Sequence, residues 1–308
     1  MSYHLADFGS YTVGGCLHEV TEGAPRRISF TRDAEYDYDP RGTFAVEHAY
    51  VQYFIPEARR AGPPVVLVHG GGMHGSTWET TPDGRPGWLH LLLRDGFEVH
   101  VIDNVERDRA GFAPGVFEGE PILRSLEEAW SLFRIGPPEG FAARAAFRDQ
   151  AFPVSAFETL GRYLVPRWLT TTPLQSAALI ALLERTGRAV VVCHSQSGEI
   201  TFDAAERRPD LFDAILAVEP SATPCDLAAY RHIPIVLMIG DHLDMDARWQ
   251  GRLERWQTVT TALAAAGADC RLLDTAKEIR PGGSHMLMMD SHSERCLAEA
   301  WRRLDASR

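Results

Sequence analysis

The sequence has few cysteines, and their spacing excludes the common cysteine-based frameworks. Five of its 308 residues are cysteine, at positions 16, 193, 225, 270 and 296. The number is odd, the positions are far apart, and no C-x-x-C pair occurs. We therefore expect neither a disulfide scaffold nor a zinc site, and the sequence predicts free thiols in a reducing compartment.

Long apolar runs are also missing. No stretch approaches the roughly 20 apolar residues that cross a bilayer as a helix. The N-terminal stretch MSYHLADFGSYTVGG has no basic segment followed by an apolar one, so it does not resemble a secretory signal. We expect a cytoplasmic protein that does not enter a membrane, unless a secretory signal has been trimmed from the chain.

Internal repeats, low-complexity blocks and runs of like charge are absent as well. The formal net charge is −11, and the acidic residues are spread along the chain. Such a surface argues against nucleic acid or an anionic membrane as a partner and leaves a small neutral substrate open. Hydrophobic residues make up 45% of the chain, which is ordinary for a globular protein with a large core.

Five short apolar runs are the clearest structural signal. They are rich in β-branched residues and lack strict alternation, which is typical of strands buried on both faces. Helical patterns separate the later runs, at 172–187, just after 195, and at 247–266, and another follows at 293–304. Strands that alternate with helices predict an α/β fold with a mostly parallel, doubly wound sheet. The runs are PPVVLVHGGG (63–72), FEVHVIDN (97–104), AVVVCHS (189–195), AILAVEP (214–220) and PIVLMIGDH (234–242).

Two segments depart from this alternation. Strand-like patches at 10–20 and 44–55, separated by the polar stretch RDAEYDYDPRG, predict an antiparallel hairpin or meander at a sheet edge. Residues 105–171 contain no convincing strand, but three short amphipathic helical patterns at 125–136, 141–152 and 155–169. We expect one domain over 1–308 with a helical cap at 105–171, above the carboxyl edge of the sheet where ligands bind. A separate small domain is the alternative.

The stretch VVVCHSQSGEI (190–200) contains two serines at a predicted strand–helix junction. A nucleophilic serine in such a strained turn needs small residues two positions before and after it. Ser195 has Cys193 and Ser197 there, whereas Ser197 has Ser195 and Glu199. Ser195 is therefore the candidate nucleophile, and Ser197 is expected to be a small residue at the helix start. The simpler alternative is a strand that ends in a turn without chemistry.

A glycine-rich loop and the residue after Ser195 are candidates for an oxyanion hole. His69-Gly70-Gly71-Gly72 follows the first core strand, and glycines let backbone N–H groups approach a developing oxyanion closely. We expect the N–H groups of Gly71 and Gln196 to be the donors, with Gly72 as the substitute for Gly71. Neither a G-x-x-x-x-G-K-[ST] nor a G-x-G-x-x-G pattern is present, which disfavours a phosphate loop.

The candidate base is His285, in the stretch RPGGSHMLMMD. It follows the last predicted strand, CRLLDT, and a glycine-rich loop, which is where the histidine falls in the chain order serine, acid, histidine. His292 is expected at the start of the last helix. We expect structural hydrogen bonds at His69 and His194, whereas His232 and His242 precede the region in which the base is expected.

Two places offer an acid to orient the histidine. The acid commonly lies a few residues after the strand that here ends at Gly240, and Asp241 and Asp244 lie on either side of that position. Glu219 ends the wholly apolar run AILAVEP, where a carboxylate is costly unless it is paired. We prefer Glu219, while a capping or loop carboxylate remains the alternative for it and the two aspartates remain alternative acids.

These residues together resemble a small bacterial carboxylesterase group of the α/β-hydrolase superfamily that uses a Ser–His–Glu triad. The motifs VVLVHGGG, HSQSG, AVEP, IGDH and GGSHMLMMD carry the resemblance, which covers nearly the whole chain. It implies an α/β-hydrolase fold, Ser195 as nucleophile, Glu219 as acid and His285 as base. It also implies oxyanion donors at Gly71 and Gln196, and a homodimer. The stretch DNVERDRAG is charged where many relatives have glycines, so substrate access is expected to differ.

The sequence thus predicts a serine hydrolase that acts on a small or medium-sized carboxylic ester, without cofactor or metal. A lactonase with the same triad is the alternative, followed by a non-catalytic ligand-binding protein. The acidic stretch DHLDMD (241–246) is interpreted as a solvated loop. Gly72, Trp78 and Trp88 are candidates for the pocket wall. Aromatic residues of the cap are expected to form mostly the cap's own core, namely Phe112, Phe133, Phe152, Phe157 and Trp168.

Overall fold

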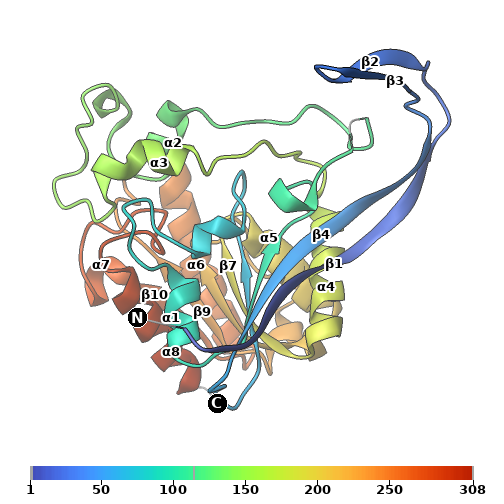
Figure 1. Cartoon of the computed structure of the whole chain (residues 1–308). Helices are drawn as coiled ribbons and strands as arrows, with labels where there is room; N and C mark the ends of the chain where they lie inside the picture. The colour runs from blue at the N-terminus through green and yellow to red at the C-terminus, as the bar shows by residue number, and fades with distance from the viewer. Residues whose placement is uncertain (1–2, 114, 307–308) are drawn as a thin grey trace.

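The computed structural model describes residues 3–113 and 115–306, and an eight-stranded sheet forms its centre (Figure 1). The strands lie in the order β1-β4-β6-β5-β7-β8-β9-β10. The pairs β1–β4 and β4–β6 are antiparallel, and all the others are parallel. The predicted fold class, a mostly parallel α/β-hydrolase sheet with an antiparallel N-terminal edge, is confirmed. The bounds are β1 (Leu5–Val20), β4 (Gly42–Pro56), β5 (Val65–Val68), β6 (Val99–Asp103), β7 (Ala189–His194), β8 (Phe212–Val218), β9 (Ile235–Ile239) and β10 (Cys270–Asp274).

Helices cover both faces of the parallel strands, which explains the unbroken apolar runs in the sequence. Val65 and Leu67 of β5 pack with α1 (Trp88–Arg94) and α8 (Ser293–Asp305). Val66 and Val68 point to the other face, against α4 (Thr172–Thr186), α5 (Ser197–Arg207) and α6 (Ala247–Ala265). Successive side chains of a strand point to opposite faces, so both sets must be apolar. The short helix α7 (Thr275–Glu278) follows β10.

The N-terminal strands extend well beyond the sheet as a two-stranded arm. β1 pairs with β4 from Leu5 to Val20, whereas β4 pairs with β6 only over residues 50–54. The arm carries the hairpin of β2 (Arg26–Thr31) and β3 (Ala34–Tyr38) at its tip (Figure 1). The antiparallel edge agrees with the prediction, and the polar stretch that separates the two strand-like patches contains β3.

Residues 105–171 connect β6 to α4 and are less helical than the sequence patterns indicated. α2 (Leu126–Leu132) and α3 (Phe157–Gly161) fall within two of the three expected helical segments. The expected helix at 141–152 is wrong, because this segment forms turns. There the N–H of Phe147 donates to the carbonyl of Ile135, 12 positions earlier, so long-range contacts replace helical hydrogen bonds.

Across residues 3–113 and 115–306, no helix combines the length and the apolar character needed to cross a bilayer.

Candidate active site

Ser195 lies in a tight turn between a buried strand and a helix. β7 ends at His194, α5 begins at Ser197, and Ser195 has φ 54°. This left-handed conformation is costly for serine and persists only when surrounding contacts enforce it. The Ser195 N–H donates to the carbonyl of Val218 (3.0 Å), and its own carbonyl accepts from the N–H of Ser221 (2.8 Å). The turn is therefore anchored to the neighbouring strand β8.

The two small neighbours of Ser195 are buried and structural. Ser197 Oγ accepts from the N–H of His194 (2.9 Å) and lies 2.9 Å from the carbonyl oxygen of Val68, to which it can donate. Burial raises the pKa of the Cys193 thiol to about 12, so this thiol stays protonated and is a poor nucleophile. Of these three residues, Ser195 lines the cavity beside the turn, whereas Cys193 and Ser197 do not.

The glycine loop after β5 lies against this turn. A Cβ on Gly70 would sit 2.5 Å from His194 Nδ1, and one on Gly71 would sit 2.8 Å from Gln196 Oε1. Neither position has room for a side chain, which explains the two glycines. Within the described ranges, no protein oxygen accepts from the backbone N–H of Gly71, Gly72 or Gln196. These amides are therefore free to donate to a bound group.

His285 and Glu219 are in direct contact in a buried pair. His285 Nδ1 lies 3.1 Å from Glu219 Oε2, and their side chains are 2% and 0% exposed. Glu219 directly follows β8 and has φ 51°, and its Oε1 also accepts from the N–H of Gly240 (2.5 Å). The ring of Phe133 stacks on His285 with its centroid 5.7 Å away. Because Nδ1 of His285 faces the Glu219 carboxylate, Nε2 is the ring nitrogen that remains for proton transfer.

Arg134 completes this cluster, and the sequence interpretation did not find it. Its Nη1 and Nη2 donate to the two carboxylate oxygens of Glu219 at 2.9 and 2.6 Å, and both side chains are fully buried. Its Nε donates to the carbonyl of Asp241 (2.6 Å), and the guanidinium lies over the ring of Trp249. The cost of burying Glu219 had indicated that a partner exists, but no sequence pattern marked Arg134, 85 positions away, as that partner.

The charges in the cluster set the ionisation of both members of the pair. Burial alone would raise the pKa of Glu219, but the Arg134 guanidinium and the His285 hydrogen bond outweigh it and hold that pKa below its usual range. Burial lowers the pKa of His285 below 6.5, and the Glu219 carboxylate only partly opposes this effect. At neutral pH the pair is therefore an ionised carboxylate beside a neutral imidazole, which is the state a general base requires.

Comparisons with known proteins identify the family to which the chain belongs. No family model matches the chain. A solved structure of a novel bacterial esterase superimposes with a TM-score of 0.86 and 32% sequence identity, covering 99% of this chain and 97% of that chain. This chain belongs to the α/β-hydrolase esterase family.

A second relative of this hydrolase is a probable secreted lipase, phiG, of a fungal species (strain ATCC 74256). The two sequences are 30% identical over 212 residues, which is 66% of this chain and 57% of the lipase. The hydrolase thus spans little more than half the length of that relative. Together, the esterase and the lipase support an enzyme that hydrolyses esters.

The alternative acids lie away from the imidazole of His285. Asp241 accepts hydrogen bonds from the backbone N–H groups of His242 and Gly282, and Asp244 is exposed. Asp149, Asp241 and His242 offer ligand atoms within 4.8 Å of one another at the surface, but Asp241 is already used by these two N–H groups. The geometry favours Glu219 as the partner of His285.

The other histidines considered as the base either make structural hydrogen bonds or do not line the cavity at Ser195. His69 Nε2 accepts from the N–H of Asn104 (3.0 Å), and His194 Nε2 donates to the carbonyl of His285 (3.0 Å), with the tautomer assigned from these partners. His292 precedes α8 as its N-cap residue. His232 and His242 are absent from the cavity at Ser195.

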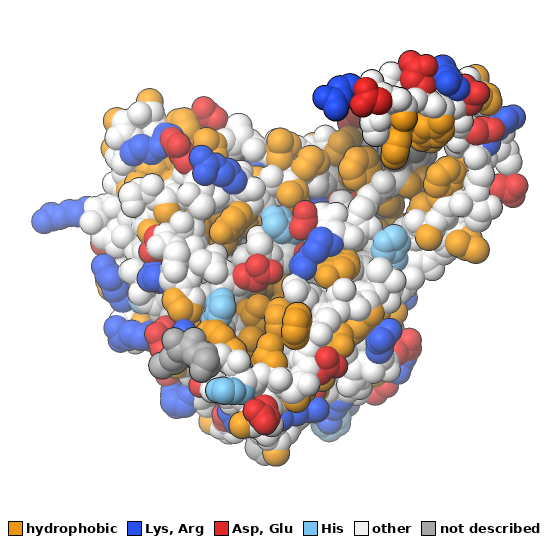
Figure 2. Space-filling model, viewed as in Figure 1, with side chains coloured by type: hydrophobic (Ala, Val, Ile, Leu, Met, Phe, Trp, Pro, Cys, Tyr) orange, Lys and Arg blue, Asp and Glu red, His pale blue; other side chains and the backbone are white. Residues whose placement is uncertain are grey.

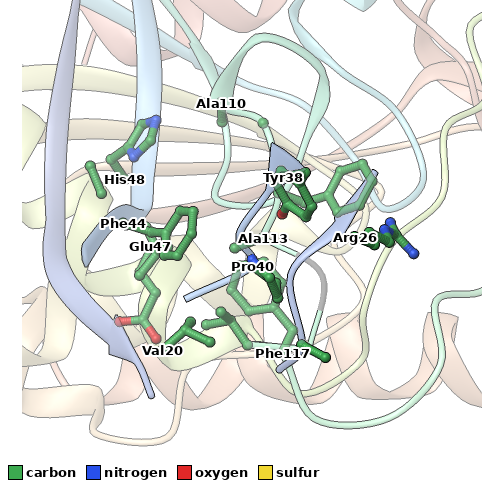
Figure 3. Close-up of a pocket in the computed structure, with 16 residues that line it drawn as sticks. Val20, Arg26, Tyr38, Pro40, Phe44, Glu47, His48, Ala110, Ala113 and Phe117 are labelled. Atoms are coloured by element: carbon green, nitrogen blue, oxygen red, sulfur yellow. The ribbon is translucent and has the colours of Figure 1, made fainter. Parts of the chain in front are cut away.

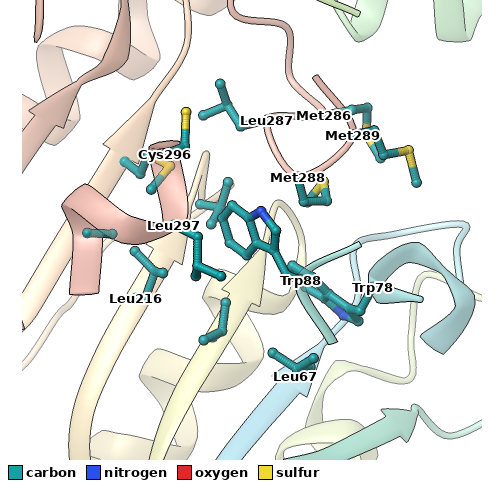
Figure 4. Packing of buried hydrophobic residues seen from close by; sticks show 14 of the residues in the cluster. Leu67, Trp78, Trp88, Leu216, Met286, Leu287, Met288, Met289, Cys296 and Leu297 are labelled. Carbon is teal, nitrogen blue, oxygen red and sulfur yellow. The ribbon is translucent and has the colours of Figure 1, made fainter. Parts of the chain in front are cut away.

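Trp78 and Trp88 are core residues, and the prediction that they form a pocket wall is wrong. Both are 0% exposed, and their rings pack 5.7 Å apart beneath the segment that contains Met288 (Figure 4). Trp88 Nε1 donates to the carbonyl of Ser293 (3.1 Å), which ties the indole to α8. Gly72 does not line the cavity either, and its carbonyl accepts from the N–H of Val165. Hydrophobicity near a loop does not distinguish a pocket wall from a core.

The aromatic residues of the 105–171 segment do not all form its core as expected, because Phe112 is 61% exposed and lines a different cavity. Phe152 and Phe157 pack in the core of that segment, and Trp168 packs against Phe112. Phe133 instead lines the cavity at Ser195. This cavity has a volume of about 180 Å³, and Gly71, Gln196 and His285 also line it.

A larger cavity of about 830 Å³ lies elsewhere, between the arm and residues 110–113 and 116–117 (Figure 3). Tyr38, Phe44 and Phe117 line it together with Glu47 and His48. Orange apolar side chains also gather around the arm in the space-filling view (Figure 2). None of the described residues that line this cavity is a serine, threonine or cysteine. Cavity volume alone therefore does not identify the candidate active site. The smaller cavity is favoured because Ser195 and His285 line it.

Proposed function

We propose that the protein hydrolyses carboxylic esters through an acyl-enzyme intermediate on Ser195. One observation carries this proposal: a serine in a strained strand–helix turn lines the same cavity as a histidine that is hydrogen-bonded to a buried carboxylate. A nucleophile, a base and an orienting acid in this order are the elements of serine-hydrolase chemistry. Arg134 is a positioning residue, because it holds the Glu219 carboxylate toward His285.

In the first half-reaction, Ser195 Oγ attacks the ester carbonyl carbon while His285 Nε2 takes the hydroxyl proton. Glu219 stabilises the resulting imidazolium through Nδ1, and the amides of Gly71 and Gln196 donate to the oxyanion. The C–O bond to the alcohol then breaks, and His285 returns the proton to the leaving alkoxide. In the second half-reaction, a water molecule deprotonated by His285 attacks the acyl carbon and releases the acid and free Ser195.

The dimensions of the site favour small substrates. The cavity at Ser195 has a volume of about 180 Å³, and Met73, Leu132, Phe133 and Leu169 supply its apolar wall. We therefore infer short acyl chains. Residues 105–171, which contribute Leu132, Phe133 and Leu169, would act as the lid over the site. Cyclic esters use the same machinery, so lactones belong in any substrate panel.

The decisive experiment compares Ser195→Ala with Ser197→Ala on p-nitrophenyl acetate and butyrate. We expect the first variant to lose turnover and covalent labelling by a fluorophosphonate probe, and the second to retain labelling. Circular dichroism checks that both variants are folded. Full turnover by Ser195→Ala, or no labelling of the wild-type protein, would overturn the proposal in favour of another nucleophile or a non-catalytic role.

The expected partners and location remain predictions. A small-molecule ester is the proposed ligand, and a homodimer is expected from the family resemblance. Sedimentation equilibrium of the purified protein tests the dimer. The fungal relative is named as secreted, so fractionation of the native host should test our expectation of a cytoplasmic protein.

A further inference from the structure

The cavity beside Ser195 is basic, although the protein as a whole is strongly acidic. Three arginines line it, Arg124, Arg167 and Arg252, against a single acidic residue, Glu199. The whole chain carries a net charge of −11. A local excess of cations in a partly buried cavity attracts anions far more effectively than the same charges on an open surface.

Arg167 reaches directly into the loop that is proposed to hold the oxyanion. A Cβ on Gly71 would lie 2.4 Å from Arg167 Nη1, so the guanidinium occupies the space that the missing side chain leaves. The backbone of Arg167 is fixed by two hydrogen bonds with Ile122, at 3.0 and 2.8 Å. Its Nε is buried without a hydrogen-bond partner, as is Oε1 of the neighbouring Gln196.

No carboxylate neutralises Arg167 within the described parts of the chain. The nearby carboxylate of Glu106 is paired with Arg107, and Glu199 is exposed and acts on Arg167 only at longer range. Burial, with the nearby charges of Arg107 and Arg124, lowers the pKa of Arg167 to about 10. A guanidinium in this setting is still charged at neutral pH, and it gains strongly from an anionic partner.

Arg252 approaches the same cavity from helix α6. Its guanidinium lies 4.6 Å from the ring centroid of Trp249, and no described carboxylate forms an ion pair with it. Burial lowers its pKa, and the carboxylate of Glu219, which Arg134 already holds, partly offsets this effect. Arg124 differs from these two because it is paired with Glu128. Two guanidinium groups without a carboxylate partner among the described residues therefore line the cavity that also contains Ser195.

We propose that Arg167 and Arg252 bind a carboxylate on the substrate, so that the enzyme acts preferentially on short esters that carry a negative charge. This inference rests on the proposed ester hydrolysis at Ser195 and specifies its substrate class. Guanidinium groups bind carboxylates through paired N–H donors, which suits both residues. The carboxylate is present before and during the reaction, so its binding lowers KM more than it raises kcat.

Two matched pairs of esters test the inference. Monomethyl succinate against methyl succinamate places the charge or its neutral isostere on the acyl side. 4-Carboxyphenyl acetate against 4-carbamoylphenyl acetate places it on the alcohol side. We expect the wild-type enzyme to prefer the charged ester in one pair by about tenfold or more in kcat/KM. This preference should decrease at high salt, because salt screens the attraction between the guanidinium groups and the carboxylate. Arg167→Gln and Arg252→Gln should remove this preference through KM, and Arg167→Lys should restore part of it.

Arg162→Gln is the matched control, because Arg162 is an exposed arginine in the same segment that does not line the cavity. It should leave the preference unchanged. Equal loss of kcat on charged and neutral esters in Arg167→Gln would instead assign Arg167 to the oxyanion and overturn the inference. The absence of any preference in both pairs would overturn it as well.

A binding measurement separates this inference from the proposed function. In the Ser195→Ala background, isothermal titration with monomethyl succinate and 4-carboxyphenyl acetate reports carboxylate binding without turnover. We expect binding of at least one of them, and its loss when Arg167→Gln is added, whether or not ester hydrolysis proves correct. Failure of both ligands to bind to folded Ser195→Ala would refute the carboxylate site even if neutral esters are hydrolysed.

Discussion

The buried ion pair between Arg134 and Glu219 should dominate the stability of the candidate active site. Both side chains are fully buried, and two hydrogen bonds of 2.9 and 2.6 Å join them. Removing one member of a buried pair leaves the other charge without compensation, which typically costs about 3–5 kcal/mol. We therefore expect Arg134→Met and Glu219→Gln each to lower the free energy of unfolding by roughly this amount.

The double variant should be much less destabilised than the sum of the two single variants. With both charges gone, no isolated ion remains buried, and the expected coupling is about 2–3 kcal/mol. The hydrogen bond from Arg134 to the carbonyl of Asp241 is lost in both variants that lack the arginine, so it cancels in the cycle.

Urea unfolding followed by circular dichroism measures these free energies without depending on Trp249, which contacts Arg134. Arg208→Met is the matched control, because Arg208 also holds a carboxylate through two nitrogens, at Asp210, but on the surface. It should leave the midpoint almost unchanged. Additivity of Arg134→Met and Glu219→Gln to within about 0.5 kcal/mol would refute the claim that the two charges depend on each other.

Four further outcomes follow from the site. The acid limb of the pH profile of kcat/KM should have an apparent pKa below 6.5, because burial lowers the pKa of His285 and only its neutral form is a base. Arg134→Met should shift this limb to higher pH, because the Arg134 charge also lowers the pKa of His285. A wild-type limb above pH 6.5 would contradict the assignment of His285 as the base. Ser197→Ala should cost about 1–3 kcal/mol of stability, measured by urea unfolding, because the buried N–H of His194 loses its acceptor. Trp88→Ala should lower the free energy of unfolding by about 3–5 kcal/mol, because Trp88 is fully buried, yet leave KM for p-nitrophenyl butyrate unchanged. A changed KM would instead indicate that Trp88 contacts the substrate. EDTA should not alter the turnover of this ester, and a loss restored by a divalent metal would point to a metal-dependent step.

Local patterns allowed much of the fold and the position of Ser195 to be predicted. Apolar runs buried on both faces and the alternation of strands with helices identify a parallel sheet whatever lies around them. The small residues at 193 and 197 are required by the turn itself, where Ser195 has φ 54°. The 141–152 segment shows the limit of this approach, because its helical pattern yields to hydrogen bonds with residues distant in sequence.

Contacts between distant segments could not be predicted in the same way. The cost of a buried carboxylate indicates that Glu219 has a partner, but any of the chain's arginines would satisfy that requirement. Trp78 and Trp88 illustrate the same limit, since an aromatic residue after a loop has the same sequence signature in a core and in a pocket.

The sequence by itself determined which residues are the candidates for chemistry: a serine in a strained turn, glycines that leave space beside it, and a late histidine. These requirements are steric and local, so they can be recognised from residues that are adjacent in the sequence. Only the tertiary structure decided which charged side chains lie beside these candidate residues. Arg134 joins Glu219 and His285, and Arg167 and Arg252 approach Ser195, because separate segments pack at one edge of the sheet. Electrostatic interactions depend on distance in space and on burial, and neither quantity can be read from positions along the chain.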